Sequence, residues 1–178
     1  MAYGNTANIN LGACEVYWGA TVDDTTSLGY TDAATEISFE TETQDVEVQQ
    51  EDAPVDVLIT AQKVSVKVPM KELDIDRMAS LLPGASVITD AVDPTSKRLV
   101  VTGAAGGTLA SSAKKLTIVP KSGNALFTVV ITKAVPKPSL NFKFGKGEAS
   151  VFEVTFEALA TGDGSSLFEI GDPDATAA

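Results

Sequence analysis

Apolar and polar residues alternate without interruption in two stretches of this chain, and this pattern restricts the fold more than any other feature. The apolar members are Val64, Val66, Val68, Phe152, Val154, Phe156 and Ala158, and the polar members between them are Lys63, Ser65, Lys67, Glu153, Thr155 and Glu157. Successive side chains of a strand point to opposite faces of a sheet. Each stretch therefore predicts a strand with one buried face and one face in water.

Other segments are rich in β-branched and aromatic residues, and one segment has a helical period. The strand-like segments are EVYWGA, KRLVVTG, KKLTIVP, ALFTVVITK and LNFKF. The helical stripe consists of Ile75, Met78, Ala79 and Leu82. Asp74 is placed to cap its start, and Pro83-Gly84 ends it. We expect one mainly β domain over residues 1–178, a β-sandwich or barrel with one flanking α-helix at about 73–82.

The segment ISFETETQDVEVQQED, residues 37–52, resembles one long strand whose apolar residues change sides. Ile37 and Phe39 occupy odd positions, whereas Val46 and Val48 occupy even ones. Such a change indicates a bulge, a turn or a new partner strand. We expect Ile37 and Phe39 in the core and residues 40–54 in an extended loop or hairpin. We also expect an N-terminal arm at 1–12 and a flexible tail at 171–178.

Composition argues against most kinds of catalysis. The chain has no histidine and one cysteine, Cys14, so the usual nucleophile–base pairs, Cys/His zinc sites and internal disulfides are excluded. Asp23-Asp24 and Asp172-Pro-Asp174 lack the spacing of a calcium loop. We therefore expect no catalytic residues, no metal site and no cofactor.

Charge and hydropathy restrict the partners. The 24 acidic residues outnumber the 13 basic residues, for a net charge of −11, which disfavours specific DNA binding. We find no apolar run of the roughly 20 residues that span a bilayer, and we expect no signal peptide. By contrast, residues 57–70 and ALFTVVITK form long β-prone runs whose edges require partners. A ring of identical subunits would supply those partners.

Three consecutive stretches resemble the major tail tube proteins of tailed bacteriophages and prophages. They are NLGACEVYWGA, SLGYTDAATEISFETETQDVEVQQEDAPVDVLIT and KVSVKVPMKELDIDRMASLLPGA, which together cover about residues 10–85. The resemblance implies a β-sandwich or barrel that forms hexameric rings, with strands joined into one β-barrel around a lumen. The rings stack into a tube that conducts the viral genome into the host cell. The family carries no catalytic residues.

The resemblance also implies partners and a location. The partners are other copies of the chain, the tail terminator, baseplate or tip, tape measure and sheath proteins, and double-stranded DNA that passes without specific binding. The location is the virion tail, assembled in the host bacterial cytoplasm. In this family a long loop reaches the adjacent ring, which here implies contacts by Thr43, Asp45, Val46, Glu47, Val48, Gln49 and Glu51.

The water-facing side of the predicted strands supplies candidates for the lumen wall. They are Glu40, Glu42, Lys63, Ser65, Lys67, Glu153 and Glu157. If this side lines the lumen, the glutamates must offset the two lysines; if it faces outward, it meets a sheath or solvent.

The alternative function is a β-sandwich binding or virion decoration module for carbohydrate or adhesion. That function would require Tyr17, Trp18 and Tyr30 to form an exposed aromatic platform. Burial of these side chains, or their packing between subunits, would favour the tube.

Overall fold

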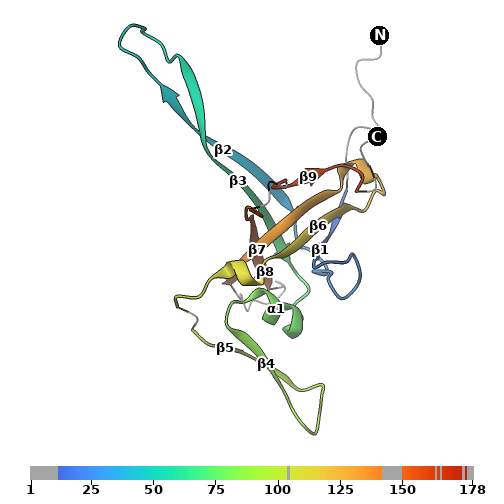
Figure 1. Ribbon diagram of the computed structural model, residues 1–178. Coiled ribbons are helices and arrows are strands. Elements are labelled where there is room, and N and C mark those ends of the chain that lie inside the picture. Colours follow the sequence, from blue (N-terminus) through green and yellow to red (C-terminus); the bar gives the residue numbers. More distant parts are fainter. Residues whose placement is uncertain are drawn as a thin grey trace.

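The two alternating stretches lie side by side as antiparallel strands in the computed structural model (Figure 1). The structure describes residues 12–103, 105–141, 150–162, 164, 166–173 and 175. Strand β3, Asp56–Met70, pairs with β8, Val151–Ala158. The expected N-terminal arm lies outside the described residues except for Gly12, as do residues 174 and 176–178 of the expected tail.

Seven strands of the described residues form one sheet that curls into a half-barrel (Figure 1). The strand order is β1-β6-β7-β8-β3-β2, and β9 pairs with β7. The further bounds are β1 Cys14–Trp18, β2 Glu36–Val46, β6 Lys114–Pro120, β7 Val129–Asn141 and β9 Glu169–Ile170. A separate hairpin joins β4, Ala85–Thr89, to β5, Lys97–Val101. Two 3-10 helices, η2 Leu109–Ser112 and η3 Ala125–Phe127, precede β6 and β7. The predicted mainly β architecture is confirmed.

One face of the sheet carries the hydrophobic core. Val66 lies opposite Phe156, and Val68 lies opposite Val154, so the apolar members of both stretches share this face. The side chains that are fully buried include Phe152, Phe156, Met70, Leu81, Leu116, Ile131, Val16, Val66, Val68 and Val154. Burying a Val, Phe or Leu side chain contributes about 1.5–3 kcal/mol each. The alternation in the sequence is therefore the direct cause of the layered arrangement.

The single α-helix described, α1 at Ile75–Leu81, packs beside β4, β5 and β7. Its predicted cap is confirmed, because the Asp74 carboxylate accepts a hydrogen bond from the Arg77 amide at 2.9 Å. The predicted stripe is partly wrong. Met78 and Leu81 are the buried residues, whereas Leu82 is half-buried and serves as the C-cap. The helix ends one residue earlier than the stripe suggests, because Leu82 has extended backbone angles.

A β-bulge interrupts the β2–β3 pairing within residues 37–52, but its additional residue lies in β3 and leaves the phase of β2 unchanged. Glu42 lies opposite Ala61 while Thr43 lies opposite Ile59, so Thr60 is an additional residue in β3. The Thr60 hydroxyl donates to the Glu42 carbonyl at 3.1 Å and holds the bulge. Bulges bend and twist a hairpin locally.

The placement of Ile37 and Phe39 in the core was only partly correct. Both lie on the core side of β2, yet their side chains are 40% and 48% exposed. The reason is that β2 is the last strand of the sheet, where the core thins. The Phe39 ring contacts the Phe168 ring, with centroids 5.4 Å apart.

Candidate assembly arm and polar sheet face

The strand register gathers the charged residues of four strands on the face opposite the core, which we call the polar face. Its members are Glu36, Ser38, Glu40, Glu42, Lys63, Ser65, Lys67, Lys137, Ser139, Glu153, Thr155 and Glu157. All seven residues that the sequence analysis proposed for a lumen wall are among them. Lys63 lies directly opposite Glu40, and Ser65 lies between Ser38 and Glu157. The structure thus brings these candidates together on one surface.

Each lysine of the polar face has a glutamate partner. The pairs are Lys63 with Glu42, Lys67 with Glu153 at 3.1 Å, and Lys137 with Glu157 at 2.5 Å. The hydrogen bond from Lys63 to Glu42 raises the pKa of the lysine. Because all six side chains are partly exposed to water, solvent screens these pairs and they contribute little to stability. Their larger effect is to neutralise the positive charges of the face.

Lys137 belongs to the polar face but was not predicted from the sequence. It lies between Pro136 and Pro138, and that context does not suggest a strand interior. The register nevertheless places Lys137 opposite Thr155, and Pro136 is paired as well. Lys137, Val135 and Ser139 occupy alternate positions, as residues on one face of a strand do. This alternation becomes informative only once the pairing of β7 with β8 is known.

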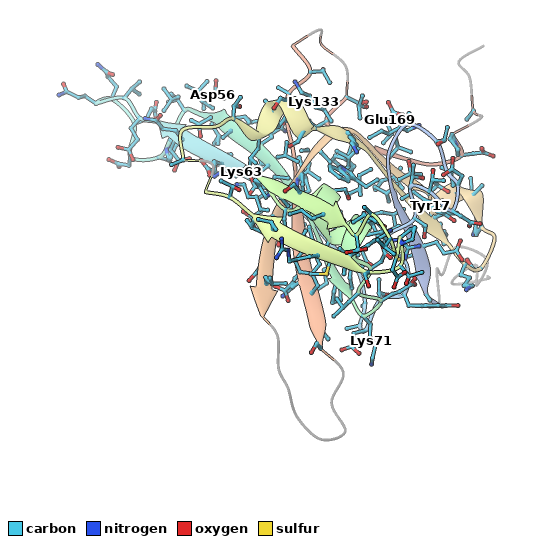
Figure 2. All side chains as sticks on the ribbon, turned by 90° about the horizontal axis from the view of Figure 1, so that it is seen from below. Tyr17, Asp56, Lys63, Lys71, Lys133 and Glu169 are labelled. Atoms are coloured by element: carbon cyan, nitrogen blue, oxygen red, sulfur yellow. The ribbon has the colours of Figure 1, made fainter. Side chains whose placement is uncertain are left out.

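The outer half of the β2–β3 hairpin projects from the body of the molecule (Figure 1). We call residues 41–62 the hairpin arm. Strand β3 pairs with β8 only from Ser65 onward, so within the sheet the arm pairs only with itself. Thr43, Asp45 and Val46 lie in its β2 strand, and Glu47, Val48, Gln49 and Glu51 lie in the connection at its tip. Asp56 marks the tip end in Figure 2.

The arm combines negative charge with exposed apolar side chains. Between residues 44 and 62 the acidic residues are Asp45, Glu47, Glu51, Asp52 and Asp56, and no lysine or arginine occurs. Val55, Val57, Leu58 and Ile59 are each more than half exposed. Residues 57–59 were not predicted as part of the arm, although three consecutive apolar residues interrupt the alternation there. Exposed apolar groups that cluster in this way are typical of a contact surface.

The two ends of the sheet differ in accessibility. Beyond β1, residues 26–28 cover the strand, since the Trp18 amide donates to the Thr26 carbonyl and the Leu28 amide donates to the Val16 carbonyl, both at 2.8 Å. Beyond β2, no strand of the described chain pairs with the outer edge. A free edge presents unpaired amide and carbonyl groups to another chain.

The three aromatic residues of the alternative function do not form one exposed platform. Trp18 is only 4% exposed and packs against Phe156, with ring centroids 5.9 Å apart. Tyr17 is half-buried and donates a hydrogen bond to Glu15 at 2.7 Å, whereas Tyr30 is 76% exposed. The contact with Glu15 raises the pKa of Tyr17 to about 12. A sugar-binding platform would need several exposed rings side by side.

Within the described part of the chain, no three Asp, Glu or Cys side chains come close enough together to hold a metal ion. The helices that the structure describes are too short or too polar to cross a membrane. Cys14 is half-buried and packs against the core as a small apolar residue.

A family model described as "Phage tail tube protein" matches residues 15–178. The chain belongs to the phage tail tube protein family. This tail tube protein is accordingly a structural component of the virion tail that assembles with itself and with other tail components. A comparison with curated proteins finds no match. The family assignment confirms the resemblance seen in residues 10–85 and extends it over the C-terminal half.

Proposed function

We propose that this tail tube protein forms hexameric rings, that the rings stack into a tube, and that the polar face lines the lumen through which the viral genome passes. The observation that carries the proposal is the charge arrangement of the polar face. Its lysines are all paired with glutamates, and Glu36 and Glu40 add further negative charge. Unpaired lysines would bind phosphates repeatedly along the passing duplex and slow it.

The open edge of β2 explains how a ring could close. Pairing of this edge with a neighbouring subunit would continue the curled half-barrel from one subunit to the next. A closed barrel leaves no free edge. Repetition of one such heterologous contact produces a ring, and the number six follows from the family resemblance.

The hairpin arm is proposed to make the contact between rings through Thr43, Asp45, Val46, Glu47, Val48, Gln49 and Glu51. Its exposed apolar residues would be buried in that contact. The arm is also long enough to extend from its own subunit, because residues 56–64 of β3 lie beyond β8 and span about 30 Å at about 3.3 Å per residue. The tail terminator, baseplate or tip, tape measure and sheath proteins are the further proposed partners.

Electron microscopy of the purified protein, alone and coexpressed with its tail partners, tests the proposal. We expect rings or tubes with a central hole. A protein that remains monomeric under every assembly condition would overturn it. The lumen assignment has its own test: Glu42→Lys with Glu153→Lys should permit tube assembly yet slow DNA ejection from the virion. Unchanged ejection through such tubes would place the polar face outside the lumen.

A further inference from the structure

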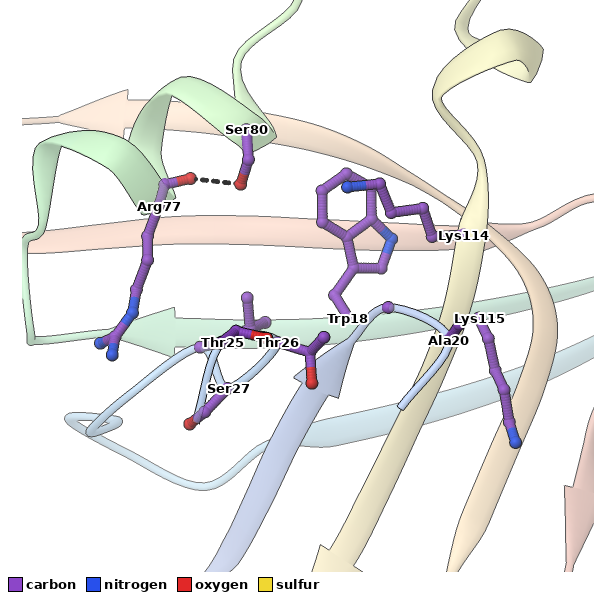
Figure 3. A pocket seen from close by; sticks show the side chains of 11 residues that line it. Trp18, Ala20, Thr25, Thr26, Ser27, Arg77, Ser80, Lys114 and Lys115 are labelled. Carbon is purple, nitrogen blue, oxygen red and sulfur yellow. Dashed lines mark hydrogen bonds between the residues drawn. The ribbon is translucent and has the colours of Figure 1, made fainter. Parts of the chain in front are cut away.

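A basic cleft lies in the body of the molecule, and no residue of the hairpin arm lines it (Figure 3). The cleft has a volume of about 530 Å³ and is formed between the loop after β1, helix α1 and the start of β6. Its basic residues are Arg77, Lys114 and Lys115, and none of its lining residues is an aspartate or glutamate. In a chain with 24 acidic and 13 basic residues, such a cleft stands out as a local site for negative charge.

The charges of the cleft differ from those of the polar face in being available. Lys114 and Lys115 form no salt bridge with any residue that the structure describes. Arg77 is held by Glu72 at 2.7 Å, so its charge is partly compensated. Lys114, whose ammonium lies over Trp18, is therefore the principal site for an incoming anion, and Lys115 adds positive charge beside it.

The cleft is held in shape before any partner arrives. The Lys114 ammonium lies over the Trp18 ring, 4.4 Å from its centroid, and the ring itself is buried (Figure 3). The Gly19 amide donates to the Lys115 carbonyl at 2.9 Å and fixes the neighbouring loop to β6. A Cβ atom at Gly19 would come within 2.3 Å of Thr26, so this close approach depends on glycine. Little ordering is needed for binding, which favours affinity.

We propose that this cleft receives carboxylates from the hairpin-arm tip of a second copy of the chain in the adjacent ring. Residues 44–62 of the arm carry five acidic residues, three of them at the tip, and no basic residue, whereas the cleft lining carries three basic residues and no acidic residue. Because the cleft and the arm are two different surfaces of the chain, their contact is heterologous, and its repetition would connect each ring to the next. The proposal rests on the stacking of rings proposed above and names the receiving site.

Genome phosphate is the competing occupant of the cleft. The arm is favoured because its acidic side chains have the opposite charge to the cleft and because the arm projects from the body of its own subunit. Charge complementarity of this kind fixes register and orientation at an interface.

A charge-swap experiment tests the proposal. The cleft variant K114E/K115E and the tip variant E47K/E51K should each raise the protein concentration required for tube formation about tenfold or more, which corresponds to about 1.4 kcal/mol per interface. Combining the two variants should restore assembly. The matched control R98E/K133E makes the same change of net charge away from the cleft and should assemble normally. Assembly is measured by sedimentation and electron microscopy, and folding is checked by far-ultraviolet circular dichroism, because Lys114 contacts the single tryptophan and its replacement would change the fluorescence directly.

Each result has a distinct meaning. If the wild type forms no rings, the proposed function fails. If the wild type forms tubes and K114E/K115E forms them equally well, only the cleft assignment fails, and slowed DNA ejection from those tubes would assign the cleft to the genome. An equal loss of assembly in the control R98E/K133E also overturns the cleft assignment. So does a failure of the combined cleft and tip variants to restore assembly. If K114E/K115E does not fold, K114Q/K115Q replaces it in a salt experiment. Salt at 1 M, where the Debye length is about 3 Å, should weaken the stacking of wild-type rings and leave the stacking of the glutamine variant unchanged.

Discussion

Replacing the tip of the hairpin arm, residues 47–55, by Asn-Gly should separate folding from assembly. Val46 and Asp56 are paired, so the two-residue loop closes β2 onto β3 at its natural register. Asn-Gly favours the turn type that such a short hairpin needs. The replacement removes Glu47, Glu51 and Asp52, changing the net charge from −11 to −8.

The expected effect on folding follows from exposure. All nine replaced residues are exposed and none belongs to the core, so no buried area is lost. Shortening the connection from nine residues to two reduces the entropy of loop closure, which is worth about 1 kcal/mol in favour of the folded state. The free energy of unfolding should therefore stay constant or rise by about that amount.

Urea denaturation followed by Trp18 fluorescence measures this free energy, because Trp18 is the single tryptophan and is buried in the core, to which no replaced residue belongs. Sedimentation and electron microscopy then measure assembly, where we expect folded protein without stacked rings. A loss of several kcal/mol would refute the reasoning by showing that the tip supports the core. Normal tube formation would refute the role of the tip in stacking.

Three further predictions concern stability. Phe156→Ala should lower the free energy of unfolding by about 3–5 kcal/mol in urea denaturation, since the side chain is fully buried; a loss below about 1 kcal/mol would contradict the packing. Asp74→Ala should cost about 1 kcal/mol through loss of the hydrogen bond to the Arg77 amide, and Asp74→Asn should largely restore it. Hydrogen bonds from Thr21 and Thr25 lower the pKa of Asp23 to about 2, so its stabilising contribution is complete above the ordinary value of 3.8 and is lost as the pH falls toward 2; NMR titration should find this low pKa, and an ordinary one would contradict the loop geometry.

The strands with strict alternation were predictable because each has one buried and one water-facing side. Val66 and Phe156 identify the core face from sequence alone, and Asp74 identifies the helix start. The partner of β3 was not predictable in this way. Its neighbour β8 lies more than 80 positions later in the chain, and alternation determines faces but does not determine partners.

The arm and the basic cleft show two further limits. Pro54 and the acidic residues indicate a break near residue 54, but the bulge at Thr60 and the exposure of Leu58 depend on how far β8 extends beside β3. The cleft is lined by Trp18, Arg77 and Lys114, which lie in three segments far apart in the sequence. No local sequence pattern therefore predicts it.

The acidic character of β2 disfavours one kind of unproductive assembly, a dimer of two edge strands. Eleven residues, Glu36–Val46, form the open edge and include no lysine or arginine. An antiparallel dimer of two such edges about a two-fold axis would set glutamates of one copy against glutamates of the other, and like charges opposite each other destabilise a strand pair. A different strand offered by a neighbour carries no such penalty. The charges of the edge strand thus select against closed pairs that would remove subunits from the growing structure.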